Sequence, residues 1–294
     1  MIERMQELIS KLQRFQGATF VIKYGGSFMD SPEATGRDGV ARDVAFLAAA
    51  GIGTVLVHGG GKAITAALAR TGVAAQFLQG LRVTDKAAAQ VVERVLSQEI
   101  NPGIVSSINS LGGRAKGFSG TEIFTCRKLR LAGADGERLD PGFVGEVVSV
   151  RTELLSACLR DGIIPVVSPT ARGQDGQIYN CNADTAAAHT AIALRAQRLV
   201  FMSDVPGLLR DAKDPATLIP RLSAGEVDGL KKSGVIDKGM IPKVNSAVAA
   251  LRAGVEKVFF VDGRVAHAIL LELRKNDTAG TEIVLDDSRL QSEG

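Results

Sequence analysis

The sequence contains no tryptophan, and aromatic residues make up only 4 % of its 294 residues. A hydrophobic core must therefore be built from aliphatic side chains, and a hydrophobic content of 45 % is ample for one. Alanine, valine, leucine and isoleucine recur in short runs bounded by glycine, which is typical of buried parallel strands. The length allows one large α/β domain or two small ones.

Three further absences narrow the class of protein. The only cysteines, Cys126, Cys158 and Cys181, are widely spaced and form no paired motif, which favours a reducing compartment over a disulfide framework. No long run of Lys or Arg accompanies the net charge of +3, so no nucleic-acid partner is expected. There is also no apolar signal core and no stretch long enough to span a membrane. By elimination, we expect a cytoplasmic protein without a membrane partner.

Residues 1–17 are predicted to form an N-terminal helical arm. Apolar side chains at positions 2, 5, 8, 9, 12 and 15 fall at helical spacing, charged side chains occupy the other faces, and Gly17 ends the pattern. This amphipathic helix either packs on its own subunit or reaches a neighbouring one, and its spacing fits both. The remaining residues, 18–294, form the main domain.

Strands and helices alternate through that domain. The predicted strands are 20–22, 54–57, 163–167, 199–202 and 257–261, and the predicted helices include 36–50, 86–98, 152–160, 184–195 and 243–253. Such alternation predicts an α/β fold with a doubly wound, mostly parallel open sheet flanked by helices. Segment 121–150 differs, because short β-like pieces flank a loop rich in Gly and Asp, and we expect a protruding β-hairpin there.

Glycine-rich turns directly follow the first two predicted strands, at Gly25-Gly26 and Gly59-Gly60-Gly61. Ligands of open α/β sheets bind beyond the carboxyl ends of the strands, and glycine lets backbone N–H groups approach a phosphate. Each turn alone is weak evidence, since tight turns also use glycine. Neither turn matches the dinucleotide fingerprint or the phosphate loop ending in Gly-Lys-Ser/Thr, which disfavours a dehydrogenase.

Two lysines lie beside such turns. Lys23 ends the first strand, and Lys243 opens a helix after Gly239-Met240-Ile241-Pro242. Phosphoryl transfer between anionic oxygens needs positive charge of this kind, although most lysines are simply solvated. Asp184 either caps the alanine-rich helix that follows it or holds the two lysines in place. Ser203–Gly207 is either a plain turn or a nucleotide-binding loop.

Together these motifs resemble the amino-acid kinase family, from about the first strand to the C-terminus. The family-level marks are Lys23–Gly26, His58–Gly61, Ser203–Gly207 and Gly239–Lys243. Three further motifs are similar to its acetylglutamate kinase branch, namely Gly80–Thr84, Asn180–Asp184 and Pro141–Val147. His58 resembles a general base, but a carboxylate acceptor is already ionised at neutral pH and needs none, so we interpret His58 as structural.

The resemblance implies a kinase that uses ATP to phosphorylate the side-chain carboxylate of N-acetyl-L-glutamate, an early step of arginine biosynthesis. It implies an amino-acid lobe, 18–175, and an ATP lobe, 176–294. The catalytic residues implied are Lys23 and Lys243, which would stabilise the transferred phosphoryl group, and Asp184, which would organise them. The substrate-binding residues implied are Gly60, Gly61, Arg82 and Asn180, with Arg82 forking onto the α-carboxylate.

The resemblance also implies a nucleotide site and an effector site. The ATP-binding residues would be Gly25, Gly26, Asp204, Val205, Pro206, Gly207, Leu208, Leu209, Val235, Ile236 and Asp237. Mg²⁺ would be held mainly by the ATP phosphates. Family members that are inhibited by arginine carry an N-terminal helix that interlaces dimers into a hexamer. By this resemblance we expect a homo-oligomer, a dimer and through the arm a hexamer, with arginine bound by His267, Glu272 and Gly280. A core-facing helix over 265–273 fits the same leucines equally well.

Some residues depart from the family pattern, and other functions stay open. Lys238-Gly239 replaces the more common glycine pair before Met240, which puts details of ATP binding in doubt. A kinase acting on an acylated aminoadipate is the nearest alternative, since one methylene changes affinity by only about 1–3 kcal/mol. A catalytically silent nucleotide or metabolite sensor is another, but the presence of Lys23, Asp184 and Lys243 together argues against it.

Overall fold

The computed structural model describes residues 9–10, 12–25, 37–133, 135–236, 239–271, 273 and 280–285. Gly26, Asp237, Lys238 and Glu272, which the sequence singles out, lie outside these residues, as does most of the predicted arm. Residues 9–10 and 12–14 of the arm are helical. None of the described helices combines the length and apolarity that crossing a membrane requires.

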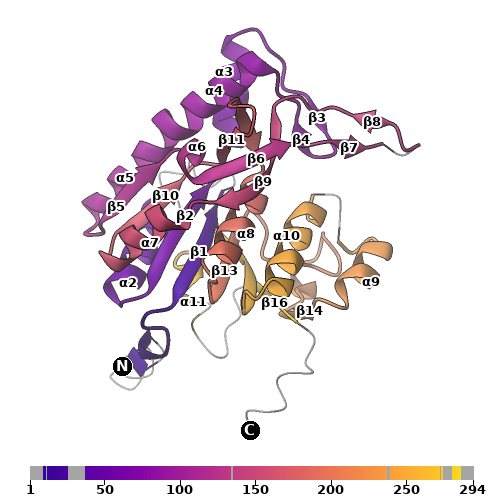
Figure 1. Cartoon of the computed structure of the whole chain (residues 1–294). Coiled ribbons are helices and arrows are strands. Elements are labelled where there is room, and N and C mark those ends of the chain that lie inside the picture. The colour runs from indigo at the N-terminus through magenta and orange to yellow at the C-terminus, as the bar shows by residue number, and fades with distance from the viewer. Residues whose placement is uncertain are drawn as a thin grey trace.

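An eight-stranded sheet forms the centre of the molecule (Figure 1). Its strands, in spatial order, are β14 (Arg221–Ser223), β16 (Gly280–Val284), β15 (Lys257–Asp262), β13 (Arg198–Ser203), β1 (Thr19–Tyr24), β2 (Gly53–His58), β10 (Ile164–Val167) and β5 (Ala115–Phe118). Neighbouring strands are parallel except β15 and β16. The prediction of a mostly parallel sheet is therefore confirmed.

Helices cover both faces of the sheet because alternate strand residues point to opposite sides. In β1, Phe20 and Ile22 pack toward one layer of helices while Val21 packs toward the other. The first layer contains α2 (Arg37–Ala49), α5 (Asn101–Ser110) and α11 (Ala268–Leu271), and the second contains α7 (Thr152–Arg160), α8 (Ala183–Ala193) and α10 (Ile241–Arg252). Four buried alanines of α8 let it lie close to the sheet and to α10.

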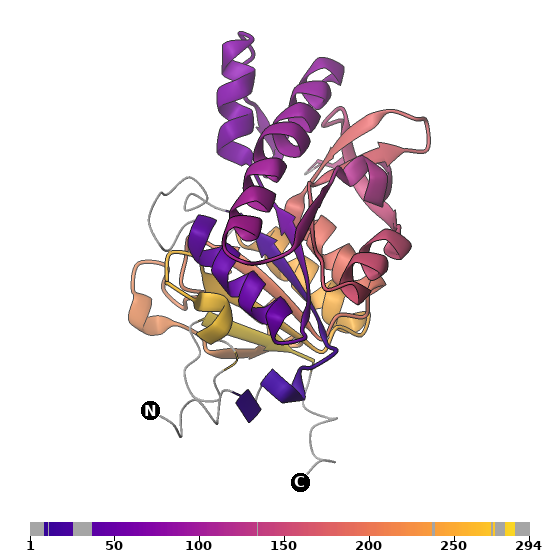
Figure 2. The same cartoon turned by 90° about the vertical axis from the view of Figure 1, so that its left-hand side faces the viewer.

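A long helix in the middle of the chain extends beyond the sheet (Figure 2). It runs without a break through α4 (Lys86–Glu93), the π-helical segment η2 (Arg94–Ile100) and α5, where the sequence predicted a helix only over 86–98. Asp85 caps its start by accepting a hydrogen bond from Ala88 N. The neighbouring helix α3 (Gly61–Arg70) packs on it through a small separate core that includes Ile64, Leu68 and Leu96.

The predicted hairpin is confirmed, since β6 (Phe124–Lys128) pairs antiparallel with β9 (Val144–Val150) apart from the main sheet. These strands also close into a four-stranded barrel with β11 (Thr170–Gly173) and β12 (Ile178–Cys181), which the sequence did not predict. The short strands β7 (Leu131–Ala132) and β8 (Arg138–Leu139) form the projecting tip (Figure 1). The proposed lobe boundary at residue 175 falls in the turn between β11 and β12, and the division into lobes stays a prediction.

The remaining elements are short. They are the strands β3 (Phe77–Leu78) and β4 (Leu81–Arg82), the helices α6 (Gly120–Ile123) and α9 (Val227–Lys232), and the 3₁₀ turn η3 (Pro215–Thr217). β3 and β4 pair as an antiparallel hairpin, which carries Arg82 to the side of α3.

Candidate active site

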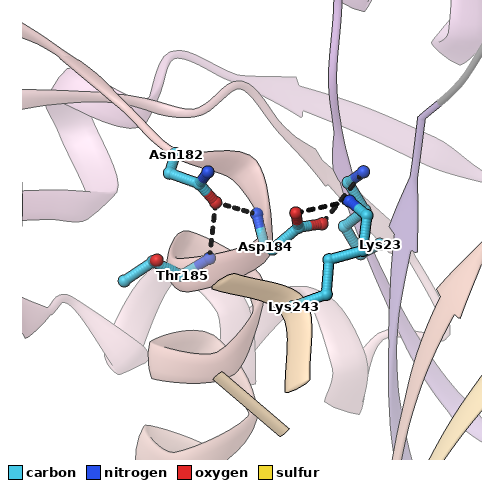
Figure 3. Close-up of polar contacts among 5 residues, drawn as sticks. All are labelled: Lys23, Asn182, Asp184, Thr185 and Lys243. Carbon is cyan, nitrogen blue, oxygen red and sulfur yellow. Dashed lines mark hydrogen bonds and ion pairs between the residues drawn. The ribbon is translucent and has the colours of Figure 1, made fainter. Parts of the chain in front are cut away.

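Lys23, Asp184 and Lys243 meet beyond the carboxyl end of β1 (Figure 3). Lys23 is the next-to-last residue of β1, whereas Asp184 and Lys243 stand in the first turns of α8 and α10. Lys23 Nζ lies 3.0 Å from Asp184 Oδ1, and Lys243 Nζ lies 2.6 Å from Asp184 Oδ2. Residues from three distant parts of the chain therefore form one ionic group.

Asn182, and not Asp184, caps helix α8. Its Oδ1 accepts hydrogen bonds from Asp184 N at 2.8 Å and Thr185 N at 3.1 Å. The interpretation of Asp184 as the cap is therefore wrong. Because Asn182 satisfies the helix terminus, the Asp184 carboxylate is free to turn toward the lysines (Figure 3).

Burial and charge act against each other in this group. Burial favours the neutral carboxyl, but the two ammonium groups outweigh it and hold the pKa of Asp184 below its ordinary value. Burial lowers the pKa of Lys23, and although Asp184 opposes this, the nearby Lys243 adds to it. One carboxylate facing two cations leaves a net positive charge beside a cavity, which suits an anionic ligand.

A cavity of about 400 Å³ adjoins this group. It contacts Lys23, Asp184 and Gly25, and also the four residues predicted to bind the substrate, Gly60, Gly61, Arg82 and Asn180. Lys243 does not border the cavity but forms an ion pair with Asp184, which does. The structure thus brings the predicted catalytic and substrate-binding residues to one place, while their roles stay predictions.

Arg82 also borders this cavity and is buried. Its Nη2 donates hydrogen bonds to Gly61 O at 3.0 Å and Thr65 Oγ1 at 2.8 Å, which hold it against α3. The guanidinium also lies 4.8 Å from the ring centroid of Phe77. Within the described part of the chain, its buried Nη1 has no hydrogen-bond partner. An unpaired buried donor is costly, so this atom suits an acceptor that the ligand brings.

Gly25 keeps the space beside Lys23 open. A Cβ at Gly25 would lie 2.9 Å from Lys23 Nζ, so a side chain there would displace the ammonium group. Asn180 lies across the cavity, where its Nδ2 donates to Thr84 Oγ1 at 3.4 Å. Both residues border the space in which a ligand would lie.

His58 is fully buried at the end of β2 and takes part in structural contacts. Its Nδ1 lies 2.9 Å from Gly59 O, and its Nε2 lies 3.2 Å from Asn101 Nδ2. Burial lowers the pKa of His58 to about 4, so the ring is neutral at physiological pH. This agrees with the interpretation of His58 as structural.

Of the predicted nucleotide residues that the structure describes, only Gly25 and Asp204 border the cavity. Asp204, which follows β13, borders the cavity. Val205, Pro206, Gly207, Leu208, Leu209, Val235 and Ile236 do not border it. The side chains of Leu208 and Ile236 are buried in the main core, so a ligand would meet the backbone or the exposed neighbours there.

Several residues that line the cavity were not predicted from the sequence. They are Phe77, Leu96, Ile100, Ile104, Val144, Pro169 and Asn182. Leu96 and Ile100 look like ordinary core residues in a sequence, because only the packing of η2 against Gly60 and α3 brings them to the cavity. Asn182 carried a detectable signal, since it directly precedes an alanine-rich helix.

The predicted effector residues lie away from this cavity. His267 Nδ1 lies 2.6 Å from Asp43 Oδ1, which joins the turn before α11 to α2. His267 adopts a left-handed backbone with φ of 59°. Gly280 is buried in β16 next to β15. Their binding of arginine stays a prediction.

The sequence is similar to known proteins over nearly its whole length. A model of the amino acid kinase family matches residues 18–262. The chain is 44 % identical to acetylglutamate kinase of Akkermansia muciniphila over 93 % of this chain and 92 % of that protein. It is 45 % identical to acetylglutamate kinase of Geobacter metallireducens over 95 % and 96 % of the two chains.

Solved structures show the same fold. N-acetylglutamate synthase from Neisseria gonorrhoeae, complexed with coenzyme A and N-acetyl-glutamate, superposes with a TM-score of 0.84 at 25 % identity, covering 97 % of this chain. This chain spans 64 % of that protein's length. The synthase complexed with coenzyme A and L-arginine gives a TM-score of 0.79 at 26 % identity, covering 97 % of this chain and 66 % of that one. Carbamate kinase of Giardia gives 0.67 at 17 % identity, over 92 % of this chain and 99 % of that one.

The full-length similarity to kinases and the matching family model lead to one assignment. The chain belongs to the amino acid kinase family.

Proposed function

We propose that this kinase transfers the γ-phosphoryl group of ATP to the side-chain carboxylate of N-acetyl-L-glutamate. The carboxylate oxygen attacks the γ-phosphorus, the bond from that phosphorus to the bridging oxygen breaks, and ADP and N-acetyl-L-glutamyl 5-phosphate form. The observation that carries this proposal is the cavity that joins Lys23 and Asp184 to Arg82. The identity to acetylglutamate kinases over nearly the whole chain supports the same acceptor.

Two residues that border the cavity fit the two carboxylates of this acceptor. Arg82 Nη1 is a buried donor without a partner among the described residues, so it suits the α-carboxylate. Lys23 suits the reacting carboxylate and the phosphoryl group. An acceptor held between both would present its side-chain oxygen in a fixed direction, which is how positioning accelerates phosphoryl transfer.

Lys23 and Lys243 would stabilise the charge that spreads over the phosphoryl oxygens during transfer. Asp184 touches both ammonium groups, and we assign it the task of keeping them protonated and in position. The acceptor carboxylate is ionised at neutral pH, so no residue has to remove a proton.

ATP and its divalent ion would enter from the Asp204 side. Among the described residues, no group of three His, Cys, Asp or Glu side chains is placed to hold a metal, and Asp184 is already engaged by two lysines. This donor set fits a Mg²⁺ ion that arrives with ATP and is held mainly by phosphate oxygens. When bound, the ion would neutralise phosphate charge.

The proposal is tested by measuring ADP release with ATP, Mg²⁺ and N-acetyl-L-glutamate, using free glutamate and aspartate as controls. Hydroxylamine should trap the acyl phosphate as a hydroxamate. Turnover on N-acetyl-L-glutamate without turnover on the free amino acids is expected. Binding of ATP without hydroxamate would instead indicate a silent sensor.

Arginine inhibition and a ring-shaped hexamer form a second proposal. It is supported by the amphipathic pattern of residues 2–15 and by His267, which lies at the surface beside Asp43. That the N. gonorrhoeae synthase has been solved with L-arginine also supports it. Deleting residues 1–16 should leave smaller, active and arginine-insensitive particles, as measured by light scattering alongside the assay. An unaltered hexamer with unaltered inhibition would contradict the role of the arm.

A further inference from the structure

The π-helical segment η2 supplies the cavity wall that faces Gly60. Leu96 and Ile100, both in η2, line the cavity. A Cβ added at Gly60 would lie 2.5 Å from Ile100 Cδ1 and 2.6 Å from Leu96 Cδ2. The two side chains therefore pack directly against the Gly60 backbone and leave no room for even a methyl group between them.

The adjoining face of the same helix is fixed to the sheet. Ser97 Oγ lies 2.7 Å from Ser168 Oγ, and Asn101 Nδ2 donates to Val166 O at 2.9 Å. Ser97 and Asn101 directly follow Leu96 and Ile100 in the sequence. Because these polar contacts tie η2 to the end of β10, the wall cannot easily retreat from Gly60.

The wall is also supported from behind. Leu96 and Ile100 belong to the small core between α3 and the long helix, together with Ile64, Leu68 and Val92. A π-helical turn holds one more residue than an α-helical turn, and such turns are frequent at functional sites. Here the wider turn keeps the two apolar side chains in the cavity while the polar pair reaches the sheet.

In the proposed function, Arg82 and Lys23 hold the two carboxylates of the acceptor. An acceptor with one more methylene between its carboxylates needs more room between these contacts, and beside Gly60 the side chains of Leu96 and Ile100 close the space. We propose that Leu96 and Ile100 are specificity-determining residues that exclude acceptors longer than N-acetyl-L-glutamate. This inference rests on the proposed function.

The test compares kcat/KM for N-acetyl-L-glutamate and N-acetyl-L-2-aminoadipate, which is one methylene longer. Ile100→Ala and Leu96→Ala should each shift the ratio toward the longer acceptor by about tenfold or more, within the roughly 10–200-fold that one methylene gives in a pocket. Leu68→Ala is the matched control, because Leu68 belongs to the same small core but does not line the cavity. It should lower stability and leave the ratio unchanged.

A second pair of variants tests the contact itself. Gly60→Ala should reduce kcat/KM for N-acetyl-L-glutamate, because its methyl group meets Ile100 and Leu96. Adding Ile100→Ala to it should recover part of that loss. Any backbone strain from the alanine is common to the single and double variants and cancels in this comparison. Should Ile100→Ala fail to fold, Ile100→Val should shift the acceptor ratio in the same direction by a smaller factor.

The outcomes separate the two proposals. The parent enzyme could be active on N-acetyl-L-glutamate while Ile100→Ala and Leu96→Ala give the same acceptor ratio as Leu68→Ala. This result would overturn the specificity role of Leu96 and Ile100 and leave the proposed function standing. A parent enzyme that is inactive on both acceptors overturns the proposed function and the role of the wall with it. A ratio that changes only in the two wall variants, with partial recovery in the double variant, supports the inference.

Discussion

The cavity proposed for the acceptor and the loop proposed for the nucleotide meet at Asp204 but are built differently. On the acceptor side, buried Arg82 is held by two hydrogen bonds, and two apolar side chains pack directly against Gly60. On the nucleotide side, the loop after β13 borders the cavity only through Asp204 and is attached to the sheet by Leu208 N, which donates to Thr281 Oγ1 at 2.8 Å. A cavity lined by fixed side chains selects a small ligand by shape, whereas a loop held along one edge suits a larger ligand that lies across it.

The largest effect should come from the ionic group that both sides share. Lys243→Ala should lower kcat by at least about a hundredfold, the scale on which one transition-state donor acts. The KM for N-acetyl-L-glutamate and the KM for ATP should change much less than kcat. Lys231→Ala is a matched control, because Lys231 forms an ordinary surface pair with Asp228. A change confined to the KM for one substrate would assign Lys243 to that side alone.

Arg82→Ala should weaken the binding of N-acetyl-L-glutamate selectively. Hydrogen bonds to charged groups contribute about 1.5–3 kcal/mol, so the KM for N-acetyl-L-glutamate should rise by roughly ten- to a hundredfold. The KM for ATP should stay within about twofold. Arg82→Lys keeps the charge but not the fork and should recover only part of the loss. Equal increases in both KM values would show that the two sides are not separable.

Gly207→Ala should weaken the binding of ATP selectively. Gly207 has a φ of 150°, and a Cβ there would lie 2.6 Å from Thr281 Oγ1 and 2.8 Å from Leu218 Cδ1. The loop would have to move away from β16, and we expect the KM for ATP to rise by about tenfold, given strain of about 1–3 kcal/mol. Gly229→Ala is the control, since a Cβ at Gly229 meets nothing within 4 Å. A raised acceptor KM instead would contradict the comparison.

The smallest effect on activity should come from His58, which does not border the cavity. Because the folded protein holds the pKa of His58 at about 4 and the unfolded chain has about 6.5, protonation favours unfolding. Its contribution to stability is complete above about pH 6.5 and is lost as the pH falls toward 4. With about 1.36 kcal/mol per pKa unit, the full loss is about 3 kcal/mol.

Urea unfolding across this pH range measures the effect. His58→Gln should flatten the slope of stability against pH, even if the variant is less stable throughout. Initial rates between pH 6 and 8 should show no inflection from His58. An unchanged slope in the variant would show that another group causes the loss.

The parts predicted from the sequence depend on local patterns. Lys23 and Gly25 were placed at the carboxyl end of a strand because apolar periodicity and glycine signals lie within a few residues of each other. The alternation of strands and helices likewise fixed the fold class. These local features hold in the folded protein because β1 and β2 are buried, whichever parts of the chain supply their neighbouring strands.

The parts that were missed depend on distant pairings. The barrel requires β11 to pair with β6 and β12 with β9, and no short pattern encodes those partners. In the sequence, Leu96 and Ile100 look like core residues. Only the packing of η2 against Gly60 shows that they line the cavity. The sequence left open whether Asp184 caps α8 or holds the lysines, because it does not show that Asn182 accepts hydrogen bonds from the backbone N–H groups of Asp184 and Thr185.

The position of β1 in the sheet has a consequence for the order of folding. β1 pairs with β2 on one side and with β13, which belongs to the last third of the chain, on the other. Until β13 has been synthesised, β1 is an open edge whose unpaired backbone groups invite pairing with other chains. Lys23, on this strand, lies opposite Phe201. The lysine therefore reaches its final setting only late in synthesis, and fragments that end before β13 should aggregate.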